Sequence, residues 1–216
     1  AVGVISRPDL LRIGTPKPRA PPRKSGVFEL PGQRADEVMH RGVASVTRDT
    51  SVAVAAKRMV HDRMHRLFVS NERGALIEVF GTREVMMAIW EARVATPIGE
   101  IMSRKPFTIP YDATALTAIE RLEQAHAHGI VVLDPEGWPI GVFTQREALL
   151  ARAAPPEATV EETMSHGMLC LHETTPLYRA AAQAAQTRAR RVLVIKDRTV
   201  VGVVTGLDFA RLAHGA

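Results

Sequence analysis

The sequence lacks the segments that would place it in a membrane or among secreted proteins. Across 216 residues no apolar run approaches the ~20 residues that a transmembrane helix needs, and no basic-then-apolar signal stands at the start. The single cysteine, Cys170, excludes an internal disulfide and a zinc site built on a cysteine pair. We therefore expect a protein of the reducing cytoplasm.

Aromatic residues are also scarce, at 5%, which disfavours a stacking platform for single-stranded nucleic acid. The net charge of +5 still raises nucleic-acid binding as one hypothesis, because basic residues gather near the start of the chain. These are Arg7, Arg12, Lys17, Arg19, Arg23 and Lys24. Elsewhere bases and acids are mixed, so we do not expect nucleic acid as a partner.

What the sequence does contain is a repeat. Three similar segments align on Met39, Met102 and Met164, which lie 63 and 62 residues apart. Each segment leads into apolar residues at helical spacing, such as Leu116, Ile119 and Leu122. Candidate N-cap residues before these helices are Asp49, Asp112, and Thr174 or Thr175.

Two Val- and Ile-rich runs follow in every repeat, separated by a turn such as "NERG" or "DPEG", which indicates a β-hairpin. A second amphipathic helix closes each repeat. The predicted fold is therefore α/β (α+β), with the order strand, helix, strand, strand, helix in each repeat. A unit of about 60 residues is marginal alone, so the repeats should pack against one another.

The first residues match the end of a repeat rather than its beginning. "VGVISRPDLLRI" aligns with "VGVVTGLDFARL" at 201–212, so residues 1–13 are expected to be the strand and helix that end an incomplete fourth repeat. A Pro-rich, basic linker is expected at 14–34. Three complete repeats are then expected at 35–95, 96–154 and 155–216, and we call them repeats one, two and three.

This pattern resembles the CBS domain, named after cystathionine β-synthase. The resemblance rests on the Met-led opening, a strand such as "HRLFV", and the closing motif "GVVTGLDF", and it covers about 190 residues. It implies regulation rather than catalysis. CBS domains pair into Bateman modules whose clefts bind AMP, ADP, ATP or S-adenosylmethionine, without a catalytic cofactor, and thereby modulate an associated protein.

From the resemblance we expect a homodimer that regulates an unidentified protein. The short connection between repeats two and three favours a cleft shared by those two, with repeat one paired to the incomplete repeat. The alternative is a docking or oligomerisation scaffold whose clefts have lost their ligand. Gly81, which replaces the hydroxyl of the closing motif, and the longer acids Glu84 and Glu147 favour that alternative.

A hydroxyl three residues before a carboxylate, at a helix start, suits a nucleotide. The carboxylate can accept hydrogen bonds from the ribose diol, while the hydroxyl and the first helical N–H groups face phosphate. The matching pairs are Thr205 and Asp208, Thr144 and Glu147, and Ser6 and Asp9. The other interpretation is a plain N-cap, worth about 1 kcal/mol.

Basic residues at the "HRLFV" position are further candidates. The resemblance to the γ subunit of AMP-activated protein kinase implies that His65 and Arg66 reach phosphate, and Arg190 and Arg191 stand at the same place in repeat three. Repeat two offers His128 followed by Gly129. The alternative is that these bases lie at the C-terminal end of the preceding helix, where its dipole favours them.

The resemblance also implies adenine slots, lined by Phe107 and Thr108 and by Met168, Leu169 and Cys170, although all five suit an ordinary core equally well. No metal site is expected, because His61 and His65 share a helical spacing without a third ligand. No spacing assembles a nucleophile, a base and an oxyanion site, so we expect no enzyme activity.

Overall fold

The computed structural model describes residues 1–13, 32–125, 127–152 and 154–213, and most of the expected linker lies outside these residues. The chain divides into two compact units. The first contains Val43–Pro106 and Met168–Ala216 together with Ala1, and the second contains Val2–Gly42 and Phe107–Gly167. Each unit is described by itself.

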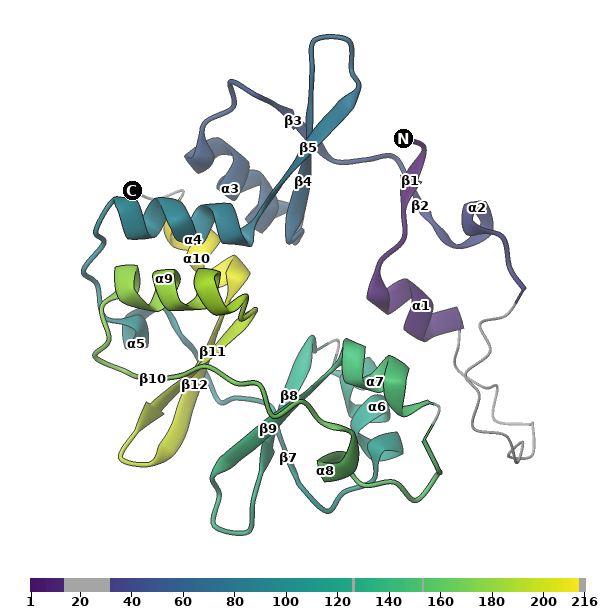
Figure 1. Cartoon of the computed structure of the whole chain (residues 1–216), viewed down its shortest axis with the longest axis vertical. Helices are drawn as coiled ribbons and strands as arrows, with labels where there is room; N and C mark the ends of the chain where they lie inside the picture. The colour runs from purple at the N-terminus through teal and green to yellow at the C-terminus, as the bar shows by residue number, and fades with distance from the viewer. Residues whose placement is uncertain (14–31, 126, 153, 214–216) are drawn as a thin grey trace. The chain divides into compact units, whose positions relative to one another are not determined.

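The first unit holds two β-α-β-β-α repeats and one additional segment (Figure 1). Repeat one contains β3 (Ser45–Thr47), α3 (Val52–His61), β4 (Arg66–Ser70), β5 (Leu76–Gly81) and α4 (Thr82–Glu91). The additional segment contains α5 (Ile98–Ile101) and β6 (Ser103–Arg104). Repeat three contains β10 (Cys170–His172), α9 (Leu177–Thr187), β11 (Arg191–Lys196), β12 (Thr199–Thr205) and α10 (Gly206–Ala213).

The second unit holds the remaining repeat and the strand and helix of an incomplete one. The first part of the chain contributes β1 (Gly3–Val4), α1 (Arg7–Ile13), α2 (Ala35–Val38) and β2 (His40–Arg41). Repeat two contributes β7 (Thr108–Pro110), α6 (Ala115–Gln124), β8 (Gly129–Leu133), β9 (Pro139–Thr144) and α7 (Gln145–Ala151), followed by α8 (Val160–Thr163). The predicted fold is confirmed, including the strand-helix tail at the start.

Each repeat is built on the same sheet. The first strand pairs in parallel with the second, and the second pairs antiparallel with the third, as in β3-β4-β5. The predicted hairpins are present: Gly74 and Gly137 adopt the positive φ that their turns require, at 74° and 85°. The side chains of Asn71 and Asp134 accept hydrogen bonds from backbone N–H groups within these turns. The turns were therefore predictable from the local sequence.

The predicted N-caps are wrong by one or two positions. α3 and α6 are capped by Ser51 and Thr114, whose hydroxyls accept from Val54 N–H and Thr117 N–H, and the N-cap of α9 is Pro176. Asp49, Asp112 and Thr174 or Thr175 belong instead to the turn that leaves the preceding strand. Four residues separate the strand from the helix in each repeat, so the predicted residue stands too early to reach the first helical N–H groups.

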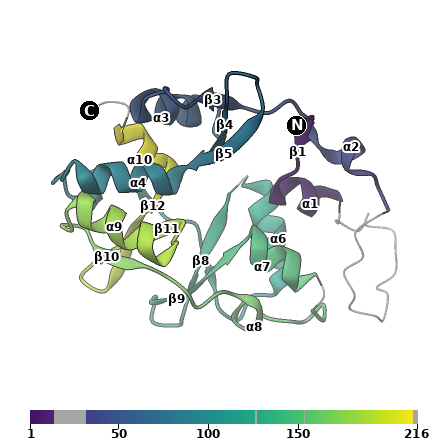
Figure 2. The same cartoon turned by 45° about the horizontal axis from the view of Figure 1, so that its top comes forward.

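Repeats one and three share a hydrophobic core within the first unit. Helices α4 and α10 lie against each other, α4 also lies along α9, and α10 contacts α3, an arrangement visible in both views (Figures 1 and 2). Met59, Ile98 and Phe209 are fully buried in this core. The expectation that repeats pack together is thus confirmed, although the helix packing joins repeats one and three. The expected cleft between repeats two and three stays a prediction.

A separate core forms in the second unit, where α1 packs on α7. Leu11 is buried among residues of repeat two such as Ile119 and Phe143. The guanidinium of Arg152 donates from Nη2 to the carbonyl oxygen of Leu11 at 3.0 Å, close to the end of α1. The tail is therefore an integral part of this unit. Within the described residues, every helix falls short of the length and apolarity that a bilayer crossing requires.

The Met-led segments do not join the sheets of the repeats that they introduce. We call residues 35–41, 97–104 and 159–165 the leading segments of repeats one, two and three. β6, from the leading segment of repeat two, pairs with β12 of repeat three, and Ser165, from that of repeat three, pairs with Val142 of repeat two. β2 of repeat one pairs with β1 of the tail. Repeats two and three thus exchange leading segments.

Candidate functional site

Four of the helices carry an acidic residue at the same position near their N-terminus, and three of these acids are candidate site residues. In α1, α4, α7 and α10 a carboxylate at the third helical position accepts a hydrogen bond from the backbone N–H of the residue three before it. The acids are Asp9, Glu84, Glu147 and Asp208. Such a carboxylate cap forms because a helix start leaves backbone N–H groups without intrahelical partners. These acids thus cap their helices, which leaves one carboxylate oxygen of each for another partner, and ligand binding by them stays a prediction.

In repeat three the cap is complete. Both the N–H and the hydroxyl of Thr205 donate to Oδ2 of Asp208, each at 2.7 Å. The second oxygen, Oδ1, accepts from Nη1 of Arg211. Asp208 is buried, whereas the Arg211 side chain is 60% exposed. A fixed carboxylate therefore meets a cation that has room to turn toward solvent.

A hollow of about 240 Å³ opens beside this carboxylate, within the first unit. Its lining consists of Ile101, Asp208, Arg211 and Leu212. Ile101 comes from α5, in the leading segment of repeat two, whereas the other three come from α10. The hollow thus combines an acceptor, a cation and two apolar side chains, which are the groups that a nucleoside or a similar polar ligand requires.

The predicted basic residues are brought to the same helix starts. Arg191 pairs with Thr205 across β11 and β12, and Arg66 pairs with Gly81 across β4 and β5. The carbonyl oxygen of His65 accepts from the N–H of Thr82, the first residue of α4, at 3.3 Å. Arg190 precedes Arg191 and is exposed. Each basic pair therefore stands next to the cap of the closing helix, and its contact with phosphate stays a prediction.

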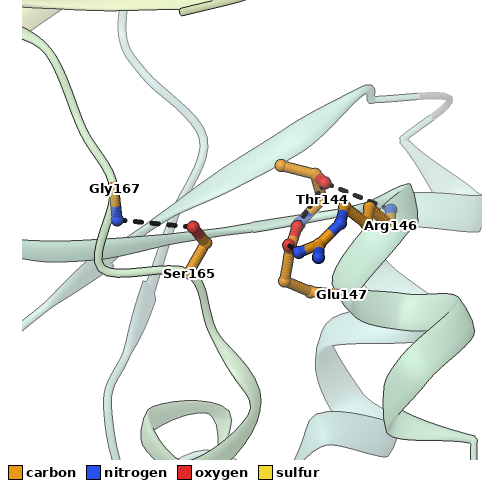
Figure 3. Close-up of polar contacts among 5 residues, drawn as sticks. All are labelled: Thr144, Arg146, Glu147, Ser165 and Gly167. Carbon is orange, nitrogen blue, oxygen red and sulfur yellow. Dashed lines mark hydrogen bonds and ion pairs between the residues drawn. The ribbon is translucent and has the colours of Figure 1, made fainter. Parts of the chain in front are cut away.

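Repeat two carries the same arrangement with a longer acid (Figure 3). The Thr144 hydroxyl donates to Oε2 of Glu147, and Nη1 of Arg146 lies 3.0 Å from its Oε1. Glu147 is buried in spite of its extra methylene group. On the neighbouring segment, the Ser165 hydroxyl accepts from the N–H of Gly167 at 3.3 Å. Gln145 contacts His128 at 3.2 Å, which brings the histidine to this helix start.

Repeat one departs from this pattern because Gly81 offers no hydroxyl. Oε2 of Glu84 accepts from the N–H of Gly81 at 2.9 Å, and Arg83 lies 3.6 Å from Oε1. The Glu84 side chain is 42% exposed, so it is held less firmly than its counterparts. An impaired half-site in repeat one stays a prediction.

The tail carries the fourth acid. Both the N–H and the hydroxyl of Ser6 donate to Oδ2 of Asp9, at 2.8 and 2.5 Å, and Nε2 of His40 lies 2.8 Å from Oδ1. Burial raises the pKa of Asp9, but the hydrogen bonds from Ser6 and the nearby His40 outweigh burial. The net pKa therefore lies below the ordinary value of 3.8.

This shift predicts a pH dependence of stability. Because the pKa of Asp9 is lower in the folded than in the unfolded chain, Asp9 stabilises the fold above about pH 4, and this contribution is lost as the pH falls through the folded pKa. Asp9→Asn should therefore be less stable than wild type at pH 6, with the difference narrowing at pH 2–3. Urea unfolding of both proteins across this range measures it. If the stability difference between wild type and Asp9→Asn did not change with pH, the pH dependence could not be due to Asp9. The same would follow if the exposed Asp36→Asn control showed the same trend.

The predicted adenine-slot residues are divided between the two units. Met168, Leu169 and Cys170 are half-buried in the first unit, where Leu169 accepts a backbone hydrogen bond from Leu193 at 2.8 Å. Burial raises the pKa of the Cys170 thiol, which lowers its reactivity. Phe107, 44% exposed, and Thr108 lie in the second unit.

The structure also adds residues that the sequence analysis missed. Arg211, Arg146 and His40 hold the second oxygens of three of the acids. Arg211 follows Asp208 by three residues, a helical spacing that could have revealed it. Ile101 gave no such signal, because only the exchange of leading segments brings it to α10. As for metals, Nδ1 of His61 contacts Asp62 at 2.7 Å, and the described residues contain no group of three potential ligands.

Comparison with known proteins agrees with this fold. The profile of the CBS domain matches residues 35–91, 98–154 and 159–215. A structure of a Methanocaldococcus jannaschii protein, MJ1225, described as a candidate archaeal homologue of g-AMPK, superposes with a TM-score of 0.77 at 14% identity. It covers 98% of this chain and 83% of that one. At this identity the likeness concerns the fold alone.

Two further relatives match about half of the chain. The CBS domain pair of M. jannaschii MJ0100, solved with 5′-methylthioadenosine and S-adenosyl-L-methionine, is 28% identical with a TM-score of 0.51, covering 56% of this chain and 98% of that one. The L-aspartate semialdehyde sulfurtransferase of the same organism is 29% identical over 122 residues. This stretch is 56% of the chain but 24% of the enzyme. With three profile matches on three repeats of the same fold, the chain belongs to the CBS-domain family.

Proposed function

We propose that the chain is a non-catalytic regulatory module that binds an adenine nucleotide or S-adenosylmethionine and modulates an associated protein in the cytoplasm, as a homodimer. The observation that carries the proposal is Asp208, a buried carboxylate that lines a hollow together with Ile101 and Leu212 and has one oxygen fixed by Thr205. The relative solved with 5′-methylthioadenosine and S-adenosyl-L-methionine supports an adenosyl ligand.

The chemistry of binding follows from the two oxygens of Asp208. Oδ2 stays with Thr205, which keeps the carboxylate oriented, while Oδ1 accepts from a ribose hydroxyl. Arg211 then turns from Oδ1 toward a phosphate or carboxylate of the ligand, because its exposed side chain can move at little cost. Arg190 and Arg191 stand at the same helix start and add further positive charge.

Regulation would arise because two different elements, α5 and α10, line the hollow beside Asp208. Ile101 belongs to the leading segment of repeat two, and Asp208 belongs to α10 of repeat three. A ligand that contacts both favours the arrangement in which α5 lies against α10, and it therefore biases the position of that segment. An associated protein that contacts either element would sense this bias.

The first experiment is thermal unfolding with S-adenosylmethionine, 5′-methylthioadenosine, AMP, ADP and ATP in turn. A ligand at ten times its dissociation constant should add about 1.4 kcal/mol. This corresponds to a rise of the midpoint by about 3–6 °C for a chain of this size. If none of the five shifts the midpoint of the folded protein, the ligand-free scaffold becomes the better hypothesis.

Two variants show whether the shift belongs to Asp208. Asp208→Ala should abolish it, but this change also removes a helix cap worth about 1 kcal/mol. Glu84→Ala is the matched control, because it removes the corresponding cap in repeat one, where no hydroxyl accompanies the acid. A shift that survives in Asp208→Ala, or that is lost equally in Glu84→Ala, would place the ligand elsewhere.

A further inference from the structure

Two arginines and two aromatic side chains gather on the surface of the first unit, where α4 ends and α9 begins. The guanidinium carbon of Arg93 lies 6.0 Å from the ring centroid of Trp90 and 5.4 Å from that of Tyr178. The guanidinium carbon of Arg179 lies 5.7 Å from the same Tyr178 centroid, and its Nε donates to the Tyr178 hydroxyl at 3.0 Å. We call these four residues the arginine–aromatic patch.

The patch is open to solvent. Trp90 is 37% exposed, Tyr178 is half-buried, and the side chains of Arg93 and Arg179 are exposed. The whole chain has two tryptophans and two tyrosines, and one of each lies here. Tryptophan, tyrosine and arginine are the residue types that dominate the binding energy of protein–protein interfaces. The composition of the patch is therefore that of an interface.

The two guanidinium groups also lack a carboxylate partner. Among the described residues neither Arg93 nor Arg179 forms an ion pair with Asp or Glu, whereas Arg48 and Arg211 each do. Both cations lie within 6 Å of the centroid of one ring, that of Tyr178, so a single anionic segment can reach both of them. The charge of the patch therefore favours an acidic partner.

A purely structural role explains only part of the patch. Helices α4 and α9 lie along each other (Figures 1 and 2), and Arg93 contacts one ring from each, so it helps to join them. Arg179 belongs to the same helix as Tyr178 and joins nothing. A second cation beside the same ring adds repulsion to the folded chain, so packing alone does not favour it.

The patch also adjoins the connection that leads to α5. Val94 and Thr96, which follow α4, each accept a backbone hydrogen bond from the start of α9, at 2.9 and 2.8 Å. α5 begins two residues after Thr96 and contributes Ile101 to the hollow beside Asp208. A polypeptide bound to the patch would therefore contact the chain segment that positions α5.

We propose that the arginine–aromatic patch docks an acidic segment of a partner polypeptide, in which carboxylates flank apolar side chains. The carboxylates pair with Arg93 and Arg179, because a guanidinium that lies over a ring can still bind a carboxylate along its edge. The apolar side chains lie against the exposed ring of Trp90. This docking does not depend on the adenosyl ligand.

Single-stranded nucleic acid also combines negative charge with groups that stack on rings. Such a strand, however, carries a phosphate at every nucleotide and is bound along a continuous basic groove. Here the exposed Glu91 follows Trp90 directly and interrupts the positive charge. Two cations beside two rings fit a short acidic peptide better.

The fluorescence of Trp90 provides the test. In the full chain with the substitution Trp138→Phe, Trp90 is the one remaining tryptophan, so the emission reports on the patch. The peptide GDELLEDG should change this emission in a saturable way, and the effect should weaken as salt is added. The uncharged counterpart GNQLLQNG should bind at least about tenfold more weakly.

Two charge variants show whether the peptide binds at the patch. Arg179→Gln should lower the affinity for GDELLEDG about threefold, with an unchanged thermal midpoint because the side chain is exposed. Arg73→Gln is the matched control, since it removes the same charge from an exposed turn of the same unit, and it should leave the affinity unchanged. No change in Trp90 emission at millimolar peptide, equal binding of the uncharged peptide, an equal loss in Arg73→Gln, or tighter binding of a short oligothymidylate would overturn the proposal.

Discussion

Replacing Phe209 by alanine should lower the free energy of unfolding by about 3–5 kcal/mol, because it removes a large side chain from a closely packed core. Phe209 is fully buried in α10, which contacts α3 and α4 of repeat one. The resulting cavity would lie among side chains of both repeats, so both should be weakened. Urea unfolding followed by circular dichroism measures the loss.

Hydrogen exchange separates a shared core from two independent ones. If repeats one and three form one cooperative core, amides of α3 and α4 should exchange faster in Phe209→Ala although the substitution lies in repeat three. Phe107→Ala is the control: that side chain is 44% exposed, and we expect a change within about 0.5 kcal/mol. Unaltered exchange in repeat one would show that the repeats do not unfold together.

The internal order of the repeats was predictable because it depends on local signals. The hairpins follow from Asn71 with Gly74 and from Asp134 with Gly137, whose turn chemistry acts within four residues. The third hairpin needs no glycine, since Asp197 and Arg198 adopt positive φ values of 43° and 67°. The strand propensity of the flanking residues identified it all the same.

The exchange of leading segments was not predictable in the same way. The segment that contains Met102 has the same pattern whether it joins the sheet of repeat two or that of repeat three, so no local signal distinguishes the two. The complementary signal, a glycine for each methionine, was present, but Gly202 lies 100 residues from Met102. A one-residue match over such a distance has meaning only once the strands are paired.

Only the polar residues of the candidate site were predictable, again because they depend on local signals. A hydroxyl and an acid three residues apart belong to one helix start, so Thr205 and Asp208 could be identified together. The hollow beside them depends on Ile101, which reaches α10 through the exchange. Sequence therefore located the polar half of the site, and tertiary structure was needed for the apolar half.

Gly202→Val should destabilise the fold by about 3 kcal/mol, although valine is the better strand residue. Strand propensity favours valine over glycine by about 1 kcal/mol. That gain is outweighed because a Cβ at position 202 meets the sulfur of Met102 and lies 3.0 Å from the carbonyl oxygen of Ser103, which belongs to the backbone and cannot easily retreat. Urea unfolding of the variant measures the net change in the free energy of unfolding.

Glu78→Val is the matched control, because it places the same side chain at the same register in repeat one, on a strand whose outer edge no described strand pairs with. There strand propensity favours valine, and the surface ion pair with Arg48 that is lost contributes little, so the stability should change by less than about 1 kcal/mol. The double variant Gly202→Val/Met102→Ala should be about 1–2 kcal/mol more stable than the sum of its single changes, because the smaller side chain makes room for valine. Strict additivity, or equal losses from Gly202→Val and Glu78→Val, would mean that glycine is not what admits the leading segment.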